Sequence, residues 1–406
     1  MAKRNDHSRV LIYSHDSFGL GHLRRCRAIA HALVQRDPQM SVLILSGSPI
    51  IGSYEFGARV DFVRIPGVIK LSNGEYTSLS LKIDLAETLA MRASIIEHTA
   101  SIFDPDLFLV DKEPLGLRGE VKGTLELLKA RGTPLVLGLR DVLDEPGQLA
   151  PEWERKNVLP ALRHLYDSIW VYGLPQICDP LEGIAVPQSV RRKVAYTGYL
   201  RRARSGGRLS WASPFGRPFI LVTPGGGGDG DELVDWVLRA YEQAGTLPHP
   251  ALIVLGPFMQ LERQSEFMVR AAALDDVEMI TFEAHMEDLM EQAVGIVGMG
   301  GYNTFCEILS FDKRAIVVPR ERPRREQFMR AERADRFGLV RMLPADEVMD
   351  TQQMIDALVR LPAQPKPSEV MIPGLLDGLD RVHALVGEAI ADARGLPATF
   401  RERQTA

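Results

Sequence analysis

The chain has 406 residues, which exceeds the usual length of one domain and predicts two or three. Hydrophobic residues make up 45% and charged residues 25%, as in ordinary globular proteins, and the net charge of -5 argues against a protein that coats nucleic acid. The three cysteines, Cys26, Cys178 and Cys306, lack CxxC spacing, which excludes a disulfide scaffold and a cysteine-rich zinc site.

The N-terminus lacks the apolar core of a signal peptide, and no run approaches the length of about 18 apolar residues that a membrane-spanning helix needs. We therefore expect a cytoplasmic protein that is at most peripheral to the inner face of the membrane.

The first half alternates short apolar runs with helical patterns. Strands are predicted at 10–13, 42–45, 60–63, 107–110, 134–139 and 169–172, and helices at 23–34 and 81–102. Such alternation is typical of a parallel sheet with helices on both faces, which binds ligands beyond the carboxyl ends of its strands. Seven residues of the strand ends and the first loop are therefore expected to face one crevice: His15, Asp16, His22, Asp111, Glu113, Arg140 and Asp141.

The alternation is interrupted by a basic, aperiodic segment and then restarts. We interpret 201–217 as an interdomain linker. Further strands are predicted at 219–222, 252–255, 279–282 and 314–319, and a last helix at 379–393. The predicted organisation is an N-terminal α/β domain (1–200), the linker, a C-terminal α/β domain (218–375), and a helix and tail (376–406).

The stretch 297–309 has the pattern of a buried strand, a glycine turn and a helix. Gly300 and Gly301 allow close approach of a phosphate, which the first free N–H groups of the helix attract. Glu307 lies one turn after Asn303, and its carboxylate suits a ribose diol. The alternative is an ordinary tight turn with Asn303 or Thr304 as helix N-cap.

Two glycine loops invite a dinucleotide interpretation that the sequence does not support. Gly225, Gly227 and Gly230 satisfy GxGxxG, but the next strand ends without a carboxylate for a ribose. In the loop 19–24, Arg24 stands where the third glycine belongs. A nicotinamide or flavin enzyme is therefore not expected, nor is any other cofactor; phosphate held by backbone amides remains.

His22 follows two glycines at a predicted helix start, where the helix dipole disfavours its protonated form. A neutral imidazole there can act as a base, and the alternative is a capping or packing histidine. No pair of histidines and carboxylates has metal-ligand spacing, so no catalytic metal is predicted.

The C-terminal motifs, over about 219–345, resemble those of the GT-B glycosyltransferases. The resemblance is greatest to the MurG-like N-acetylglucosaminyltransferases of peptidoglycan synthesis and the family 28 C-terminal domain. It rests on the glycine loop at 225–230, the loop at 282–286, Gly301-Tyr302-Asn303-Thr304-Phe305-Cys306-Glu307-Ile308, and Pro319 followed by Glu326-Gln327. The sequence departs from the family pattern at Met299, where those proteins have an arginine, and at Asn303, where they have an apolar residue.

The N-terminal half resembles two families. Gly19-Leu20-Gly21-His22 is similar to the glycine-rich loop of the MurG-like enzymes, and the longer stretch 21–30 is similar to the start of the UDP-sugar hydrolase of the pseudaminic acid pathway, whose histidine is the proposed base.

The resemblance implies two Rossmann-like domains facing a cleft and metal-independent transfer of a hexose of the N-acetylglucosamine type. The donor is a UDP-sugar, and the acceptor is a glycan or lipid-linked precursor of a cell envelope polysaccharide. The alternative is a nucleotide-sugar hydrolase or a non-hydrolysing 2-epimerase on the same fold.

The resemblance also implies roles for individual residues. On the donor side these are Gly300, Gly301 and Thr304 around the diphosphate, Glu307 at the ribose, Glu283 at the uracil through its backbone, and Gln327 at the sugar hydroxyls. The donor site is also expected to include Gly225, Gly226, Gly227, Asn303 and Glu326, with Arg322 or Arg324 helping the diphosphate to depart. On the acceptor side these are His22 as base, Asp16 or Asp111 as substitute bases, and Gly19, Gly21, Arg140 and Asp141 along the cleft.

Overall fold

The computed structural model describes residues 7–16, 21–70, 76–203, 213–226, 228–283, 285–345 and 348–395. These residues form two compact units. The N-terminal unit takes its residues from 1–175, 179–200 and 377–406, and the C-terminal unit from 176–178 and 201–376.

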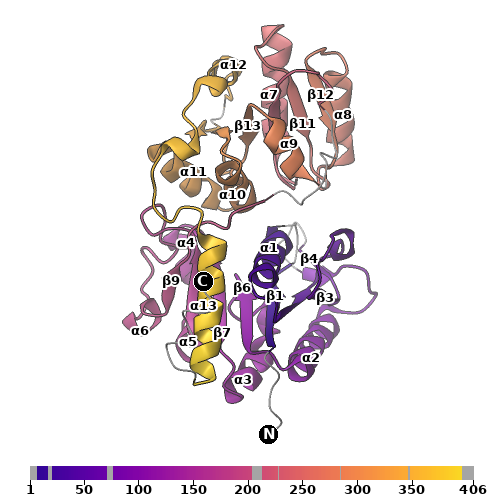
Figure 1. Ribbon diagram of the computed structural model, residues 1–406. Helices are drawn as coiled ribbons and strands as arrows, with labels where there is room; N and C mark the ends of the chain where they lie inside the picture. The colour runs from indigo at the N-terminus through magenta and orange to yellow at the C-terminus, as the bar shows by residue number, and fades with distance from the viewer. Residues whose placement is uncertain are drawn as a thin grey trace. The chain divides into compact units, whose positions relative to one another are not determined.

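The N-terminal unit is built on a parallel sheet, which in the described residues has seven strands in the order β3-β2-β1-β6-β7-β8-β9 (Figure 1). These strands are β1 (Ser8–Ser14), β2 (Met40–Ser46), β3 (Val60–Arg64), β6 (Leu107–Asp111), β7 (Leu135–Arg140), β8 (Ser168–Tyr172) and β9 (Val194–Tyr196). A separate antiparallel pair is formed by β4 (Val68–Lys70) and β5 (Tyr76–Ser78). The helices are α1 (Gly21–Arg36), α2 (Leu85–Phe103), α3 (Lys122–Ala130), α4 (Pro146–Arg155), α5 (Val158–His164), α6 (Gln188–Arg191) and α13 (Gly378–Ala393), with 3-10 turns η1 (Ile51–Ser53) and η2 (Leu117–Gly119).

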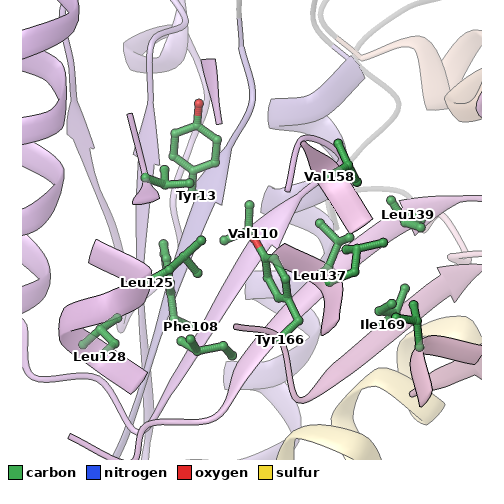
Figure 2. Close-up of a cluster of buried hydrophobic side chains, with 14 of the residues drawn as sticks. Tyr13, Phe108, Val110, Leu125, Leu128, Leu137, Leu139, Val158, Tyr166 and Ile169 are labelled. Carbon is green, nitrogen blue, oxygen red and sulfur yellow. The ribbon is translucent and has the colours of Figure 1, made fainter. Parts of the chain in front are cut away.

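A cluster of buried apolar side chains lies between this sheet and its helices. Figure 2 shows residues of β6, β7, β8 and α3 in this cluster, with Tyr13 at its edge and the tyrosine hydroxyl pointing away from the apolar side chains. Strand order reverses between β1 and β6, which places the topological switch point of the sheet at their carboxyl ends.

The last helix, α13, belongs to the N-terminal unit, where it packs beside α1 and β6. Arg36 of α1 donates to Asp380 at 3.0 Å, and Arg394 donates to Asp106, which precedes β6, at 2.9 Å. The helix that the sequence predicts at 379–393 therefore completes the first unit of the chain.

The C-terminal unit has a second parallel sheet, with six strands among the residues described, in the order β12-β11-β10-β13-β14-β15. The strands are β10 (Ile220–Thr223), β11 (Ala251–Val254), β12 (Val277–Ile280), β13 (Gly295–Gly298), β14 (Arg314–Val317) and β15 (Arg341–Met342). The helices are α7 (Asp231–Ala244), α8 (Leu261–Ala271), α9 (Met286–Gln292), α10 (Tyr302–Ser310), α11 (Glu326–Arg336) and α12 (Thr351–Arg360), with 3-10 turns η3 (Leu361–Ala363) and η4 (Pro367–Glu369). The switch point of this sheet lies between β10 and β13.

The predicted fold class is confirmed, since each unit contains a parallel α/β sheet. Helix starts differ from the predicted ones. α2 begins at Leu85 because Asp84 and Glu87 form a capping box, and α1 begins at Gly21, so that Gly21 and His22 lie in its first turn. In the part of the chain that is described, no helix is long and apolar enough to cross a membrane.

The loop at 225–226 is held by a close backbone approach at Gly256. Gly256 has φ +92°, and a Cβ there would lie 2.6 Å from the carbonyl oxygen of Gly225. Gly245, in the same unit, also has a positive φ of +68°, but a Cβ there meets nothing within 4 Å.

These two glycines make a matched pair for mutation. Gly256→Ala combines backbone strain with a steric clash and should lower the free energy of unfolding by about 2–4 kcal/mol. Gly245→Ala carries the backbone strain alone and should cost about 1 kcal/mol. Chemical denaturation of both variants measures the difference. If both lose the same free energy of unfolding, the loop at 225–226 can move away from the new Cβ without an energetic cost.

Candidate active site

In the N-terminal unit, three charged or titratable side chains meet at the switch point. Asp111 is the last residue of β6, and His22 and Arg25 project from the first turns of α1, three residues apart and so on one face. His22 Nδ1 lies 2.5 Å from Asp111 Oδ2. Arg25 donates to both oxygens of the same carboxylate, at 2.8 Å through Nε and 2.7 Å through Nη2. Arg25 and Asp111 are almost completely buried.

This geometry fixes the proton on the His22 ring. Burial raises the pKa of Asp111, but the Arg25 guanidinium and the His22 ring outweigh that effect and hold this pKa well below its usual range. Arg25 Nη2 lies 3.0 Å from His22 Nδ1, but it donates at the shorter distance of 2.7 Å to Asp111. Since an ionised carboxylate only accepts hydrogen bonds, the 2.5 Å contact assigns the proton to His22 Nδ1, which donates to Asp111. Burial lowers the pKa of His22 to about 4, against the opposing charge of Asp111. At neutral pH the ring is therefore uncharged, and Nε2 carries a lone pair.

The two predicted substitute bases are both engaged in other contacts. Asp111 is the hydrogen-bond partner of His22. Asp16 is buried; one of its oxygens accepts the N–H of Leu23 in the first turn of α1 at 3.1 Å, and the other accepts the Ser46 hydroxyl at 2.6 Å. Asp16 thus caps the first turn of α1 through its side chain and joins the helix to β2.

The remaining predicted residues of the acceptor side lie as follows. Arg140 ends β7 and is half-buried. Asp141 is completely buried, and its carboxylate accepts the N–H of Val142 at 2.8 Å and the hydroxyl of Tyr199 at 3.0 Å. Gly21 is the first residue of α1, and Gly19 lies outside the described residues. Asp141 therefore supports the fold and does not line an open crevice.

In the C-terminal unit, both strands at the switch point end in glycine turns. Gly225 follows β10 with φ +86°, and Gly300 follows β13 with φ +73°. Gly301 is the N-cap of α10, so the alternative of Asn303 or Thr304 as cap is wrong. Since a glycine has no side chain to cap the helix, the first N–H groups of α10 remain suited to an anion. Gly226 is exposed next to Gly225, whereas Gly227 lies outside the described residues.

Asn303 of α10 is held by Arg202, and Glu307 of the same helix is buried. Asn303 Oδ1 accepts from Arg202 Nη2 at 2.8 Å, and the Arg202 N–H donates to Ser310 at 2.8 Å. Glu307 is only 2% exposed. Arg202 lies in the segment that the sequence analysis interprets as an interdomain linker, and a basic, aperiodic run carries no signal for its contacts with two residues of α10.

A second polar group lies where α11 begins. Glu326 is buried, and Arg320 Nη2 donates to its Oε1 at 2.7 Å. Its Oε2 is also buried and has no hydrogen-bond partner among the described residues. The Arg320 N–H donates to Gln327 Oε1 at 3.1 Å, and the Arg320 side chain pairs with Asp229. Arg320 was not predicted, although its place after the carboxyl end of β14 is a signal that could have identified it.

Glu283 and Arg322 lie in loops of the same unit. The Glu283 carboxylate accepts the N–H of His285 at 2.8 Å, and Arg322 is exposed. Within the described ranges, no group of three or more His, Cys, Asp or Glu side chains could hold a metal ion.

The C-terminal sequence matches a known family model, that of the glycosyltransferase family 28 C-terminal domain, over residues 219–372. No curated protein matches the chain in sequence.

Solved structures with the same two-sheet architecture are similar to the whole chain. UGT2 of Phytolacca americana, solved with UDP-2fluoro-glucose and pterostilbene, has a TM-score of 0.61 at 14% identity, covering 98% of this chain and all of that one. MurG of Acinetobacter baumannii has a TM-score of 0.51 at 14% identity, over 98% of both chains. A putative UDP-N-acetylglucosamine 2-epimerase from Listeria monocytogenes has a TM-score of 0.65 at 10% identity, over 96% of this chain and 98% of that one.

At such identities the structural likeness establishes the fold, and the family 28 match adds the class of the C-terminal domain. Together they confirm the prediction of a glycosyltransferase with the GT-B fold.

The His22–Asp111 contact predicts an unusual tautomer that can be measured without knowing the reaction. Nitrogen-15 NMR of the histidine rings should show His22 protonated at Nδ1 and unprotonated at Nε2 at pH 7, and the ring should take up its second proton at about pH 4. The variant His22→Gln assigns the signals. An Nε2–H tautomer, or a midpoint near pH 6.5, would contradict the assigned geometry.

Proposed function

We propose that the chain transfers a hexosyl group of the N-acetylglucosamine type from a UDP-sugar to a hydroxyl of a glycan or lipid-linked acceptor. The observation that carries this proposal is the His22–Asp111–Arg25 arrangement at the switch point of the N-terminal sheet. A neutral imidazole with one nitrogen held by a carboxylate and the other available is suited to take a proton from a hydroxyl.

The chemical step follows from that arrangement. The acceptor oxygen forms a bond to C1 of the sugar while its proton passes to His22 Nε2. The bond from C1 to the UDP oxygen breaks, and its electron pair leaves with UDP. Asp111 stabilises the imidazolium that forms, and Arg25 keeps Asp111 ionised throughout.

The C-terminal unit binds the donor in this proposal. The diphosphate lies against the glycine turns that follow β10 and β13, near the N–H groups of α10, and Glu307 binds the ribose. The Glu283 backbone holds the uracil. The unpartnered Oε2 of Glu326, next to Gln327, accepts a sugar hydroxyl, which would satisfy a buried carboxylate oxygen.

Metal independence is part of the proposal. A departing diphosphate needs positive charge, which helix N-termini and arginines provide as well as a metal ion does. Arg322, exposed beside Arg320 in the segment before α11, supplies such a charge. Transfer should therefore proceed at an unchanged rate in the presence of EDTA.

The proposed acceptor and cellular location rest on the resemblance to the MurG-like enzymes and not on residues of the candidate site. We place the enzyme in the cytoplasm, with peripheral contact to the inner face of the membrane and a role in a cell envelope polysaccharide. A MurG structure among those similar to the chain supports this view.

A nucleotide-sugar hydrolase or non-hydrolysing 2-epimerase is the second candidate. The observation that favours it is the likeness in fold to the putative UDP-N-acetylglucosamine 2-epimerase, with a TM-score of 0.65.

The first test of the proposal begins with donor binding. UDP-, GDP- and dTDP-sugars are screened by the shift they cause in the melting temperature of the full chain, and UDP-N-acetylglucosamine should give the largest rise. UDP release should then depend on an added acceptor, and His22→Gln should lower kcat by about 100- to 10,000-fold, because the proton acceptor is lost.

The variant must still melt as the wild type does and respond to UDP-N-acetylglucosamine, which separates loss of chemistry from loss of folding. Rapid release of UDP and free sugar without acceptor would identify a hydrolase. Conversion of the donor sugar to its C2 epimer would identify an epimerase.

The unpartnered oxygen of Glu326 allows binding of the sugar and binding of the nucleotide to be tested separately. Glu326→Gln should raise the KM for the UDP-sugar by about 10- to 100-fold, because a hydrogen bond to a charged group is lost, while the affinity for free UDP stays the same. Isothermal titration with UDP and steady-state kinetics measure the two quantities.

Glu321→Gln provides the control, because Glu321 is an exposed residue of the same segment and pairs with Arg325 at 3.6 Å. If Glu326→Gln weakens UDP and UDP-sugar equally, Glu326 does not bind the sugar.

A further inference from the structure

A second histidine stands at the same strand end as the proposed base. His15 directly follows β1 and is 6% exposed. The centres of its ring and the His22 ring are 5.8 Å apart, and the ring planes meet at 84°. His15 is thus a neighbour of the proposed base for which the transfer step has no role.

A buried chain of hydrogen bonds fixes the orientation of this ring. Arg92 donates to both oxygens of Glu120 at 2.6 Å, so Glu120 is held as an acceptor. The Tyr13 hydroxyl donates its single proton to Glu120 at 2.5 Å. Its oxygen can then only accept from His15 Nδ1, which lies 3.3 Å away. This hydroxyl is the one that Figure 2 shows pointing away from the apolar cluster.

The consequence is a second ring with a free acceptor nitrogen. Because Nδ1 of His15 must donate to Tyr13, Nε2 carries a lone pair, and the described residues give it no hydrogen-bond donor. Burial also lowers the pKa of His15 well below its usual value, which keeps the ring neutral.

The charged groups next to His15 are paired with each other. Glu113 accepts from Lys156 at 2.9 Å and lies 4.0 Å from Lys112, and Lys156 also donates to Glu152 at 2.6 Å. The local charges therefore balance, and the two histidines present hydrogen-bond acceptors to a neutral ligand.

Two neighbouring rings that each engage a buried partner through Nδ1 suit a ligand with two adjacent hydrogen-bond donors. A hydroxyl binds an imidazole nitrogen at about 2.8 Å, so two neighbouring hydroxyls can bridge rings whose centres are 5.8 Å apart. A ligand with one hydroxyl would leave one nitrogen without a donor.

We propose that His15 binds the acceptor substrate by accepting a hydrogen bond from the hydroxyl next to the one that reacts. The acceptor is then a sugar or another polyol with neighbouring hydroxyls, and not a phenol or a simple alcohol. This inference rests on the proposed function of the chain as a transferase.

The test uses UDP-N-acetylglucosamine as donor with methyl β-D-glucopyranoside, its monodeoxy derivatives and 4-nitrophenol as probes of the acceptor. His15→Phe keeps a ring but removes the acceptor nitrogen, and should raise the KM for the glucoside about tenfold with a smaller effect on kcat. His15→Gln, whose amide oxygen can accept, should recover part of the loss. Tyr13→Phe removes the hydroxyl that fixes the proton on His15 Nδ1, so that either tautomer can form. This variant should raise the KM for the glucoside by an intermediate factor.

The monodeoxy derivatives identify the hydroxyl that His15 binds. With the wild type, the KM for one derivative should exceed the KM for the parent glucoside. The factor should equal the one by which His15→Phe raises the KM for the parent glucoside. In His15→Phe, that derivative and the parent should become equal, as a double-mutant cycle requires for a direct contact. An unchanged melting shift with UDP shows that the variants are folded and bind nucleotide.

The outcomes separate the two proposals. Transfer to 4-nitrophenol and to none of the glucosides, or an equal loss with every acceptor in His15→Phe, overturns the role of His15 and leaves the transferase intact. Hydrolysis or epimerisation of the donor without transfer overturns the proposed function itself.

Discussion

The bidentate pair between Arg25 and Asp111 is the interaction on which the candidate site depends. It keeps a buried carboxylate ionised, and the ionised carboxylate dictates which nitrogen of His22 carries the proton. It also joins the first turns of α1 to the end of β6, the two elements that flank the switch point. A buried ion pair of this kind contributes little net stability, because desolvation offsets attraction, so its value lies in orientation.

The same construction occurs twice among the described residues of the N-terminal unit. Arg92 holds Glu120 as Arg25 holds Asp111, and in each case the carboxylate determines the proton position on a histidine, directly for His22 and through Tyr13 for His15. Each acceptor nitrogen is thus set by groups that are themselves buried and paired. Such preorganisation means that little reorganisation is needed when a substrate binds.

The sequence predicted the parallel sheets, the glycine turns and the position of His22 at the start of a helix, because periodicity, turns and strand ends are local properties. It selected Asp16, Asp111 and Asp141 together, since all three follow strands, but it could not say that Asp16 caps α1 or that Asp141 is buried under Tyr199. Arg25 was missed as the partner of Asp111 because 86 residues separate them. Contacts of that kind depend on how the whole unit packs, and a single sequence carries no record of them.

The position of α13 has a consequence for how the chain folds. The N-terminal unit draws its last helix from 378–393, whereas the C-terminal unit occupies most of the residues between 201 and 376, so one unit is inserted within the sequence of the other. During synthesis from the N-terminus, the C-terminal unit is complete before the first sheet receives α13, with its contacts to Arg36 and Asp106. The first unit to begin folding is therefore the last to finish.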